Sequence, residues 1–214
     1  MRNNKVLSLT KFSILLAIEA IFCFTFLGSI PIPFTSVVAT LAAIPIVITA
    51  IMLGPWAGTL MGFFAGLFSL IVWTMASSNP MALIFSPAAK LGEFSGSWLS
   101  LIVCFVPRIL VGTVSGLLFK VFSKHTENKF ISYGVSGLIG SFINTIGVLG
   151  LAYIFFAPTL RTILGESLEF SMFDLFQAFV VTTALANGIP EAILAFLSAA
   201  LVCPPLQQIA SKTE

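Results

Sequence analysis

The chain alternates long apolar runs with short clusters of glycine, proline and charged residues. An apolar helix needs about 20 residues to cross a hydrocarbon core of roughly 30 Å, and in lipid every backbone polar group must be satisfied within a helix or a closed barrel. The recurring runs therefore predict a bundle of six membrane-spanning helices. We place these spans at residues 8–27, 36–53, 56–75, 97–122, 131–156 and 172–203.

Prolines shape the second and the last of these spans. Because proline removes a helical hydrogen bond, Pro45 is expected to interrupt the second span. The run from Leu53 to Pro55, with a glycine between them, is expected to end that span in a tight hairpin to the third. In the last span, Pro190 is expected to kink the helix beside Glu191.

The composition agrees with this pattern. Of the 214 residues, 58% are hydrophobic and 8% are charged, and the mean hydropathy is +1.09, whereas a soluble domain carries about 25% charged residues. We therefore interpret residues 1–214 as a single all-α integral membrane domain. The cysteines lie in apolar segments without metal-ligand or disulfide spacing and are interpreted as small buried hydrophobic residues: Cys23, Cys104 and Cys203.

Basic residues outside the spans favour one orientation in the membrane, since connections rich in Lys and Arg usually face the cytoplasm. This rule places both termini in the cytoplasm. It places the long connections between spans one and two, three and four (residues 76–96) and five and six (residues 157–171) outside, where Lys90 and Arg161 lie. The cytoplasmic set contains Arg2, Lys5, Lys11, Lys120, Lys124, Lys129 and Lys212.

The connection at residues 76–96 is long and apolar, and it includes Phe85, Lys90 and Glu93. Structureless connections beyond about 12–15 residues are usually functional lids or disordered segments, and this one is too hydrophobic to be disordered. We interpret it as a lid over an outward-facing site. The alternative is a re-entrant or interfacial connection in which Lys90 and Glu93 are solvated.

Arg108 is a costly residue in the middle of the fourth span, because an ionisable side chain inside the bilayer must be paired or face a cavity. Two interpretations stay open. Arg108 pairs with Glu191 of the sixth span and holds the helices in register, or it forms the floor of a cavity and meets an anionic or polar ligand with its planar set of donors. Asn144, on a small-residue face of the fifth span, is expected to look into the bundle.

Small residues recur at four-residue spacing, which lets helix backbones approach closely in lipid. Gly58, Gly62 and Gly66 form such a face on the third span, and Gly112 and Gly116 form one on the fourth. Internal packing and contact with a separate membrane partner both account for these faces. A shorter stripe on the first span is a candidate surface for partner docking: Ser13, Ala17 and Ala20.

Several catalytic motifs are absent from the sequence. There is no G-x-x-x-x-G-K-[ST] phosphate loop, so the chain does not hydrolyse ATP by that route. The single histidine, His125, lies in a charged connection, which leaves neither a metal site nor a serine–histidine catalytic pair inside the membrane. We therefore expect a protein that is not an enzyme, binds no cofactor or metal, and has no nucleic-acid partner.

Four stretches carry a family resemblance. They are the hairpin "IPIVITAIMLGPWAGTLMGFFAGLFSLI", the fourth-span run "GEFSGSWLSLIVCFVPRILVGTVSGLLFK", the fifth-span run "GLIGSFINTIGVLGLAYIFF" and the sixth-span run "NGIPEAILAFLSAALVCPPL". In this order they resemble the substrate-binding S components of energy-coupling factor (ECF) vitamin transporters over nearly the whole chain. Within that family, the chain looks most like the pantothenate S components.

The resemblance implies a six-helix protein of the bacterial cell membrane that captures a vitamin from outside, under the loops that follow helices one and three. It also implies assembly with a transmembrane scaffold subunit and two cytoplasmic ATPases, which consume the ATP. S components touch the scaffold through an A-x-x-x-A stripe on the first helix. The matching positions in this chain read Ser13 and Ala17, a conservative departure that keeps the face small.

Two kinds of vitamin fit the residues. The carboxylate of pantothenate suits Arg108 or Lys90, whereas a flat vitamin such as hydroxymethylpyrimidine or folate needs aromatic stacking partners; the subgroup resemblance favours pantothenate. Stacking candidates are Phe34, Phe85, Phe94 and Trp98. The expected ligand site consists of Thr40, Phe85, Lys90, Glu93, Arg108 and Asn144.

The sequence leaves two other functions open. One is a proton-coupled secondary transporter in which Arg108 and Glu191 form the switch, although such proteins often contain internal inverted repeats and residues 8–75 and 131–203 show no convincing similarity. The other is a membrane scaffold whose small-residue faces only organise other proteins.

Overall fold

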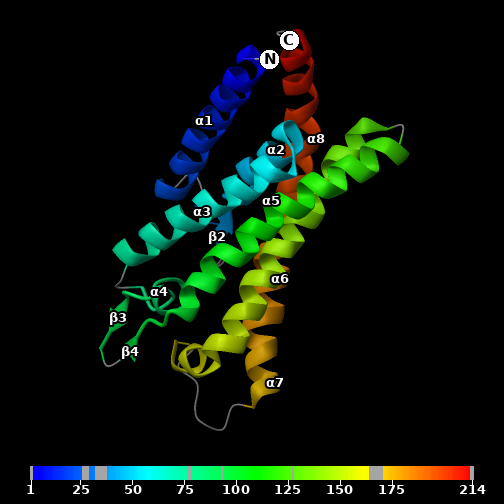
Figure 1. The fold of residues 1–214 in the computed structure, drawn as a ribbon. Coiled ribbons are helices and arrows are strands. Elements are labelled where there is room, and N and C mark those ends of the chain that lie inside the picture. The colour runs from blue at the N-terminus through cyan, green and yellow to red at the C-terminus, as the bar shows by residue number, and fades with distance from the viewer. Residues whose placement is uncertain are drawn as a thin grey trace.

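The computed structural model describes residues 2–25, 29–31, 38–76, 79–92, 94–126, 128–163 and 171–212. This part of the chain is a bundle of long helices (Figure 1). Both termini lie at one end of the bundle, which we call the terminal end, and the short helix α4 (Ala82–Phe85) lies at the other, the α4 end. The long helices are α1 (Arg2–Phe24), α3 (Pro55–Met75), α5 (Leu99–His125), α6 (Lys129–Ile163) and α8 (Ile189–Lys212).

Within the described ranges, five helical segments are long and apolar enough to cross a membrane. The last of them, Met172–Ile209, runs through α7 (Met172–Leu175) and two π-helical turns, η2 (Phe176–Val181) and η3 (Ala184–Gly188), into α8. The turn η3 ends just before Pro190. Because proline has no N–H and crowds the preceding turn, a widened π turn accommodates it at the place where a kink was predicted.

The prediction of a membrane-spanning helix from residue 36 is wrong for the first half of the second span. Residues 38–40 form strand β2, which pairs antiparallel with β1 (Ser29–Pro31), and helix α2 runs only from Ala43 to Leu53. Pro45 therefore lies in the first helical turn, where its missing N–H breaks no helical hydrogen bond. At about 1.5 Å per residue, α2 reaches roughly 16 Å, half of a hydrocarbon core. Helices α1, α3, α5, α6 and α8 surround it, so it is a buried half-length helix and not a full span.

The predicted hairpin between α2 and α3 is present. Gly54 joins the two helices with a φ of 96°, which glycine adopts without the steric penalty of a Cβ atom. Pro55 then begins α3 in the position where a helix does not need the N–H. This tight turn lays α2 against α3.

The glycine faces of α3 and α5 pack on each other. A Cβ atom at Gly58 would lie 2.6 Å from the carbonyl oxygen of Gly112, and one at Gly62 would collide with the backbone carbonyl of Arg108. These glycines therefore serve internal packing, which was one of the two open interpretations. Their contact holds the backbone at Arg108 directly against α3.

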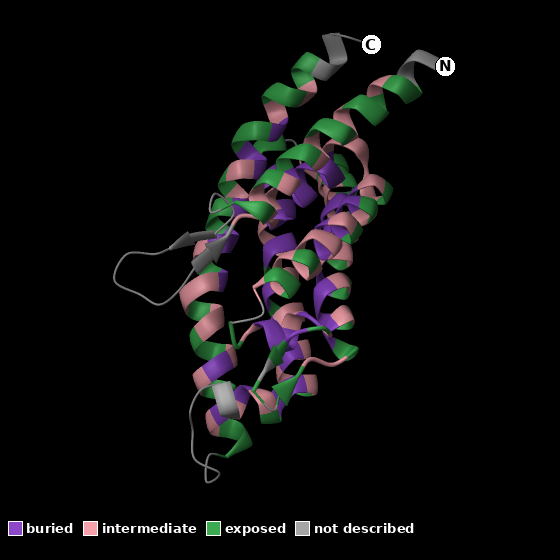
Figure 2. Cartoon of the chain, turned by 90° about the vertical axis from the view of Figure 1, so that its left-hand side faces the viewer, coloured by how far each residue is buried: buried purple, intermediate pink, exposed green. Residues whose placement is uncertain are grey.

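Helix α6 packs between α5 and α8. Its predicted end at residue 156 coincides with a break, because Phe156 has a non-helical φ of −124° and ψ of 20°, and a short helical stretch containing Pro158 follows. Figure 2 shows buried residues along the inner faces of the helices and exposed residues outside. Many of the exposed residues are large and apolar, as expected where lipid is the solvent.

The predicted lid between α3 and α5 is a structured element. It consists of α4 and a small hairpin of strands β3 (Lys90–Leu91) and β4 (Phe94–Ser95). Ile84 of α4 is buried and belongs to a core cluster that also contains Val103 of α5 and Leu160 of α6. The segment is therefore packed onto the α4 end of the bundle.

Candidate ligand-binding site

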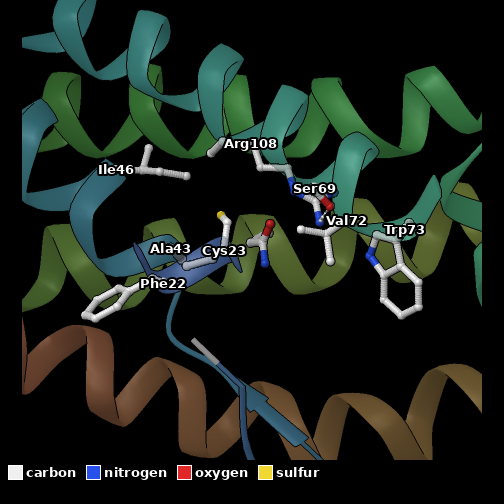
Figure 3. A pocket seen from close by; sticks show the side chains of 11 residues that line it. Phe22, Cys23, Ala43, Ile46, Ser69, Val72, Trp73 and Arg108 are labelled. Carbon is white, nitrogen blue, oxygen red and sulfur yellow. Dashed lines mark hydrogen bonds between the residues drawn. The ribbon is translucent and has the colours of Figure 1, made fainter. Parts of the chain in front are cut away.

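A cavity of about 140 Å³ lies among α1, α2, α3, α5 and α6 (Figure 3). Its polar groups come from Ser69 of α3, Arg108 of α5 and Asn144 of α6. Most of the wall is apolar, and a few polar groups on an apolar surface are the usual composition of a small-molecule site. The other lining residues are Phe22, Cys23, Ala42, Ala43, Ile46, Ala65, Val72 and Trp73.

Pro107 explains how Arg108 is held at this wall. It lies inside α5 and has no N–H, so the carbonyl of Val103, four residues earlier, lacks its usual helical donor. The side chain of Arg108 fills this gap, because its Nη1 donates to the Val103 carbonyl oxygen at 2.9 Å. The proline thus creates the acceptor that anchors the neighbouring arginine to its own helix.

The guanidinium of Arg108 has two other described contacts. Its Nη2 donates to Ser69 Oγ at 3.3 Å, and its Cζ lies 5.8 Å from the centroid of the Phe85 ring. Within the described part of the chain, none of these contacts is an ion pair, and none of them is to Glu191, the partner in one of the two open interpretations. The described residues use two of the five N–H donors of the guanidinium. With respect to this part of the chain, the other three are available to a ligand in the cavity.

Two side chains of α5 fix the position of Phe85. Cys104 Sγ donates to the Phe85 carbonyl oxygen at 3.0 Å, and Ser100 Oγ donates to the Leu83 carbonyl oxygen at 3.3 Å. The Phe85 ring stacks on Trp73 of α3, with centroids 5.0 Å apart and an interplanar angle of 19°. Cys104, interpreted from the sequence as a small hydrophobic residue, therefore also helps to hold α4 over the site.

The structure brings part of the predicted ligand site together. Arg108 and Asn144 line the cavity, and Phe85 adjoins it through Arg108 and Trp73. Lys90 lies elsewhere, exposed on the β3–β4 hairpin, and does not line the cavity. Of the two cations proposed from the sequence to meet an anion, the cavity thus contains only Arg108 among the residues that the structure describes.

Other predicted residues lie away from the cavity or outside the described residues. Glu93 and Phe34 are outside them, and so is the side chain of Thr40, whose backbone belongs to β2. Phe94 and Trp98 are described but exposed, and neither lines the cavity.

The sequence reasoning missed the contribution of α3 to the site. Ala65, Ser69 and Val72 recur at the spacing of one helix face, on which Ser69 is the polar position. That spacing was a usable signal, but the neighbouring glycine face is the stronger pattern on this helix. Trp73 extends the same wall and was not among the predicted aromatic residues.

The predicted partner stripe lies on the surface of α1. Ser13 and Ala17 are exposed, and Ala20 is half-buried. The stripe is therefore accessible on the described surface and does not serve the internal packing that occupies the glycines of α3 and α5.

The five apolar helices and the polar cavity define a multi-pass membrane protein built around a small-molecule site. Residues 7–203 match the family described as ECF transporter, substrate-specific component. The chain therefore belongs to this family: it is an S component, a non-enzymatic substrate-binding transport subunit of the cell membrane. The family resemblance drawn from the sequence is confirmed.

Two relatives cover most of the chain. The pantothenic acid transporter PanT of Lactococcus lactis subsp. cremoris is 30% identical over 168 residues, which are 78% of this chain and 76% of that protein. The pantothenate transporter PanT of Leuconostoc mesenteroides subsp. mesenteroides is 27% identical over 206 residues, 87% of this chain and 94% of that protein.

A solved structure shares the fold. The crystal structure of the S component for biotin from an ECF-type ABC transporter has a TM-score of 0.56 and 18% sequence identity, and the match covers 97% of this chain and 94% of that one. This similarity supports the all-α membrane fold and says nothing about the ligand.

Proposed function

We propose that this S component binds pantothenate and delivers it inward with an ATP-driven ECF module. The observation that carries the proposal is Arg108, a guanidinium on the cavity wall with unused donors and no ion-pair partner among the described residues. A half-buried cation inside a membrane-spanning segment is costly unless a counter-charge compensates it. The carboxylate of pantothenate supplies that counter-charge, and the names of both PanT relatives agree with this ligand.

The rest of the cavity suits the rest of pantothenate. Asn144 offers both a donor and an acceptor to the amide or the hydroxyl groups of the ligand. Ile46 and Val72 offer an apolar wall to its dimethyl carbon. The ligand is thus held by a charge at one end, an amide side chain along its length and apolar contact around it.

A flat vitamin such as hydroxymethylpyrimidine or folate is the second candidate. Trp73 is the observation that favours it, because an indole ring on the wall is a stacking surface. One face of this ring already stacks on Phe85, and hydroxymethylpyrimidine, which is neutral, would leave the charge of Arg108 without compensation. Folate has carboxylates of its own, so the stacked face of Trp73 and the names of both relatives are what favour pantothenate over it. The observations therefore favour pantothenate.

A proton-coupled secondary transporter receives less support. That mechanism was suggested by a switch between Arg108 and Glu191, whereas the hydrogen bonds of Arg108 go to Val103 and Ser69. The family assignment also points to partner subunits as the source of energy.

The proposed orientation places the α4 end outside and both termini in the cytoplasm. Basic residues favour this arrangement: Lys5 and Lys11 lie in the first half of α1, and Lys124 lies in the last turn of α5. In this orientation α4 and the β3–β4 hairpin cover the site from outside. A transmembrane scaffold subunit and two cytoplasmic ATPases complete the transporter, since the chain has no phosphate loop of its own.

Ligand binding by the purified protein tests the proposal. Isothermal titration with pantothenate, hydroxymethylpyrimidine, folate and thiamine is expected to give tight binding for pantothenate alone. Tight binding of one of the other vitamins, with none of pantothenate, would overturn the substrate assignment and leave the family assignment intact.

Ala17→Trp is expected to leave pantothenate binding unchanged and to abolish transport by the complete ECF complex. The residue is exposed on α1 and does not line the cavity, and an indole would prevent the close helix approach that small residues permit. Uptake of labelled pantothenate into proteoliposomes measures the effect.

Ile18→Trp is the matched control for this variant. Ile18 is also exposed on α1, but it points about 100° away from Ala17 around the helix. Transport is expected to survive in this control. Loss of binding in Ala17→Trp would show that the stripe supports the fold and not a partner.

A further inference from the structure

Ser69 is the polar residue that α3 contributes to the cavity, and the proposed binding mode gives it no role. Its Oγ accepts a hydrogen bond from Arg108 Nη2 at 3.3 Å, and both residues line the cavity. Figure 3 shows their side chains next to each other, one from α3 and one from α5. The guanidinium and this hydroxyl therefore form one polar corner of a mostly apolar wall.

The hydrogen bond from Arg108 determines what the hydroxyl of Ser69 can still do. A serine hydroxyl has one proton to donate and two lone pairs that accept, whereas a guanidinium only donates. The oxygen of Ser69 is therefore the acceptor in its contact with Arg108, and its proton points to another group. Toward a ligand beside Arg108, Ser69 is a donor.

The proton of Ser69 has no oxygen acceptor on its own helix. Thr59 and Thr74 of α3 donate to the carbonyl oxygen four residues earlier, at 2.9 and 2.7 Å. Ser69 has no such bond, and within the part of the chain that the structure describes its hydroxyl donates to no oxygen. Cys104 of α5 is close enough to interact with Ser69, but a thiol is a weak acceptor. A ligand oxygen in the cavity is a better acceptor for this proton.

The packing of α3 on α5 fixes the position of this corner. A Cβ atom at Gly62 would collide with the backbone carbonyl of Arg108, and one at Gly66 would lie 3.1 Å from the carbonyl oxygen of Cys104. The two backbones that carry Ser69 and Arg108 are thus in direct contact beside the cavity. Donors that are already held in place lose little freedom when a ligand binds, which favours affinity.

We propose that Ser69 is a specificity-determining residue that donates its hydroxyl proton to the ligand carboxylate held at Arg108. This inference rests on the proposed function, in which Arg108 receives the carboxylate of pantothenate. An ionised carboxylate only accepts hydrogen bonds, so it fits a corner in which both protein groups donate. Because a hydrogen bond to an ionised group is about twice as strong as one between neutral groups, Ser69 increases the preference for an anion over a neutral ligand.

The test compares pantothenate with pantothenyl alcohol, in which a CH₂OH group replaces the carboxylate. Titration calorimetry on the purified full chain gives both dissociation constants. Ser69→Ala is expected to weaken pantothenate binding by about tenfold and binding of the alcohol by about twofold, because only pantothenate loses a hydrogen bond to a charged group. The preference for pantothenate should therefore fall by about fivefold.

Two variants separate the donated proton from the volume of the side chain. Ser69→Cys keeps a similar size but supplies a weak donor, so the preference should fall nearly as far as in Ser69→Ala. Thr59→Val removes a hydroxyl of α3 that bonds to Thr113 of α5 at 2.7 Å, away from the cavity, and should leave the preference unchanged. Because both ligands are measured on the same preparation, a change in the folded fraction cancels from the ratio.

A double variant distinguishes contact with the ligand from orientation of Arg108. If Ser69 only orients the guanidinium, Ser69→Ala has no further effect once Arg108 is replaced by glutamine, since coupled residues are not additive. If Ser69 donates to the carboxylate, the same substitution weakens pantothenate binding further in the Arg108→Gln background. We expect a further loss of about threefold.

An unchanged preference in Ser69→Ala would overturn the inference, as would the full preference in Ser69→Cys or an equal fall in Thr59→Val. The absence of a further loss in the double variant would assign Ser69 to positioning Arg108 and overturn the ligand contact. Arg108→Gln alone tests the proposed function. If it keeps the full preference for pantothenate over the alcohol, the carboxylate does not bind at Arg108, and the proposed binding mode itself is wrong.

Discussion

Arg108→Gln is expected to weaken pantothenate binding by at least about 30-fold while the helix bundle stays folded. Removing one partner of a buried, hydrogen-bonded charge pair costs about 2–5 kcal/mol, and about 1.4 kcal/mol corresponds to a tenfold change in affinity. The glutamine side chain can still donate to the Val103 carbonyl, so the local structure of α5 around Pro107 should be kept. Titration calorimetry measures the affinity, and a thermal melt of the same sample reports the fold.

Lys90→Gln is the matched control, because it removes a cation from the exposed β3–β4 hairpin and not from the cavity. Its affinity for pantothenate should remain within about twofold of the unaltered protein, as for most surface substitutions. A large loss of pantothenate affinity in Lys90→Gln, together with a small loss in Arg108→Gln, would show that the carboxylate binds at the hairpin and not in the cavity.

Rescue provides a second check on the role of Arg108. If Arg108→Met loses folding and binding, and Glu191→Leu restores both in the double variant, the arginine serves as half of an ion pair. The contacts of Arg108 with Val103 and Ser69 lead us to expect intact folding and no rescue of binding.

Gly112→Ala is expected to lower the free energy of unfolding by about 3 kcal/mol, at the upper end of typical overpacking costs. A Cβ atom there would collide with the carbonyl of Gly58 and lie 2.9 Å from the backbone nitrogen of Thr59. Because the obstacle is backbone, neither helix can relieve the clash by a side-chain rotation. The helices must separate, and the contact between Gly62 and the backbone of Arg108 opens with them.

Gly150→Ala is the matched control for this prediction. Gly150 lies in α6, and a Cβ atom there would meet nothing within 4 Å. Alanine in an open helical position is expected to be neutral or to stabilise by about 0.5–1 kcal/mol. Thermal melts of both variants in the same detergent measure the difference. Equal melting temperatures would contradict the close backbone packing of α3 and α5.

The spanning helices were predictable from the sequence because lipid requires long apolar runs, whatever their tertiary partners. The start of α2 was not predictable, since residues 38–40 continue into the helix without a glycine, a proline or a charge between them, and only their pairing with β1 distinguishes them. The π turns before Pro190 were also hidden: the sequence indicates where the proline disturbs the backbone but not whether the helix bends or widens.

The same reasoning explains which site residues could be found. Arg108 and Asn144 are polar residues in apolar runs. Because a polar side chain inside the membrane is costly unless it is paired or faces a cavity, both could be identified from the sequence as candidate site residues. Trp73 and Cys23 resemble their apolar neighbours, and only the approach of α1 to α3 brings them to one cavity. Lys90 does not line the cavity, and the sequence could not show this, because a charge in a connection gives no indication of where that connection folds.

The sparse burial of α1 has a consequence for how the molecule moves. Parts of a protein with few buried contacts open at the lowest free-energy cost, and α1 has by far the smallest buried share of the five spanning segments. Its amide protons should therefore exchange with solvent deuterium before those of α3, α5 and α6 wherever water reaches them. Because α1 has so few buried contacts, it can change its position relative to the rest of the bundle while the glycine-packed pair α3–α5 stays in place.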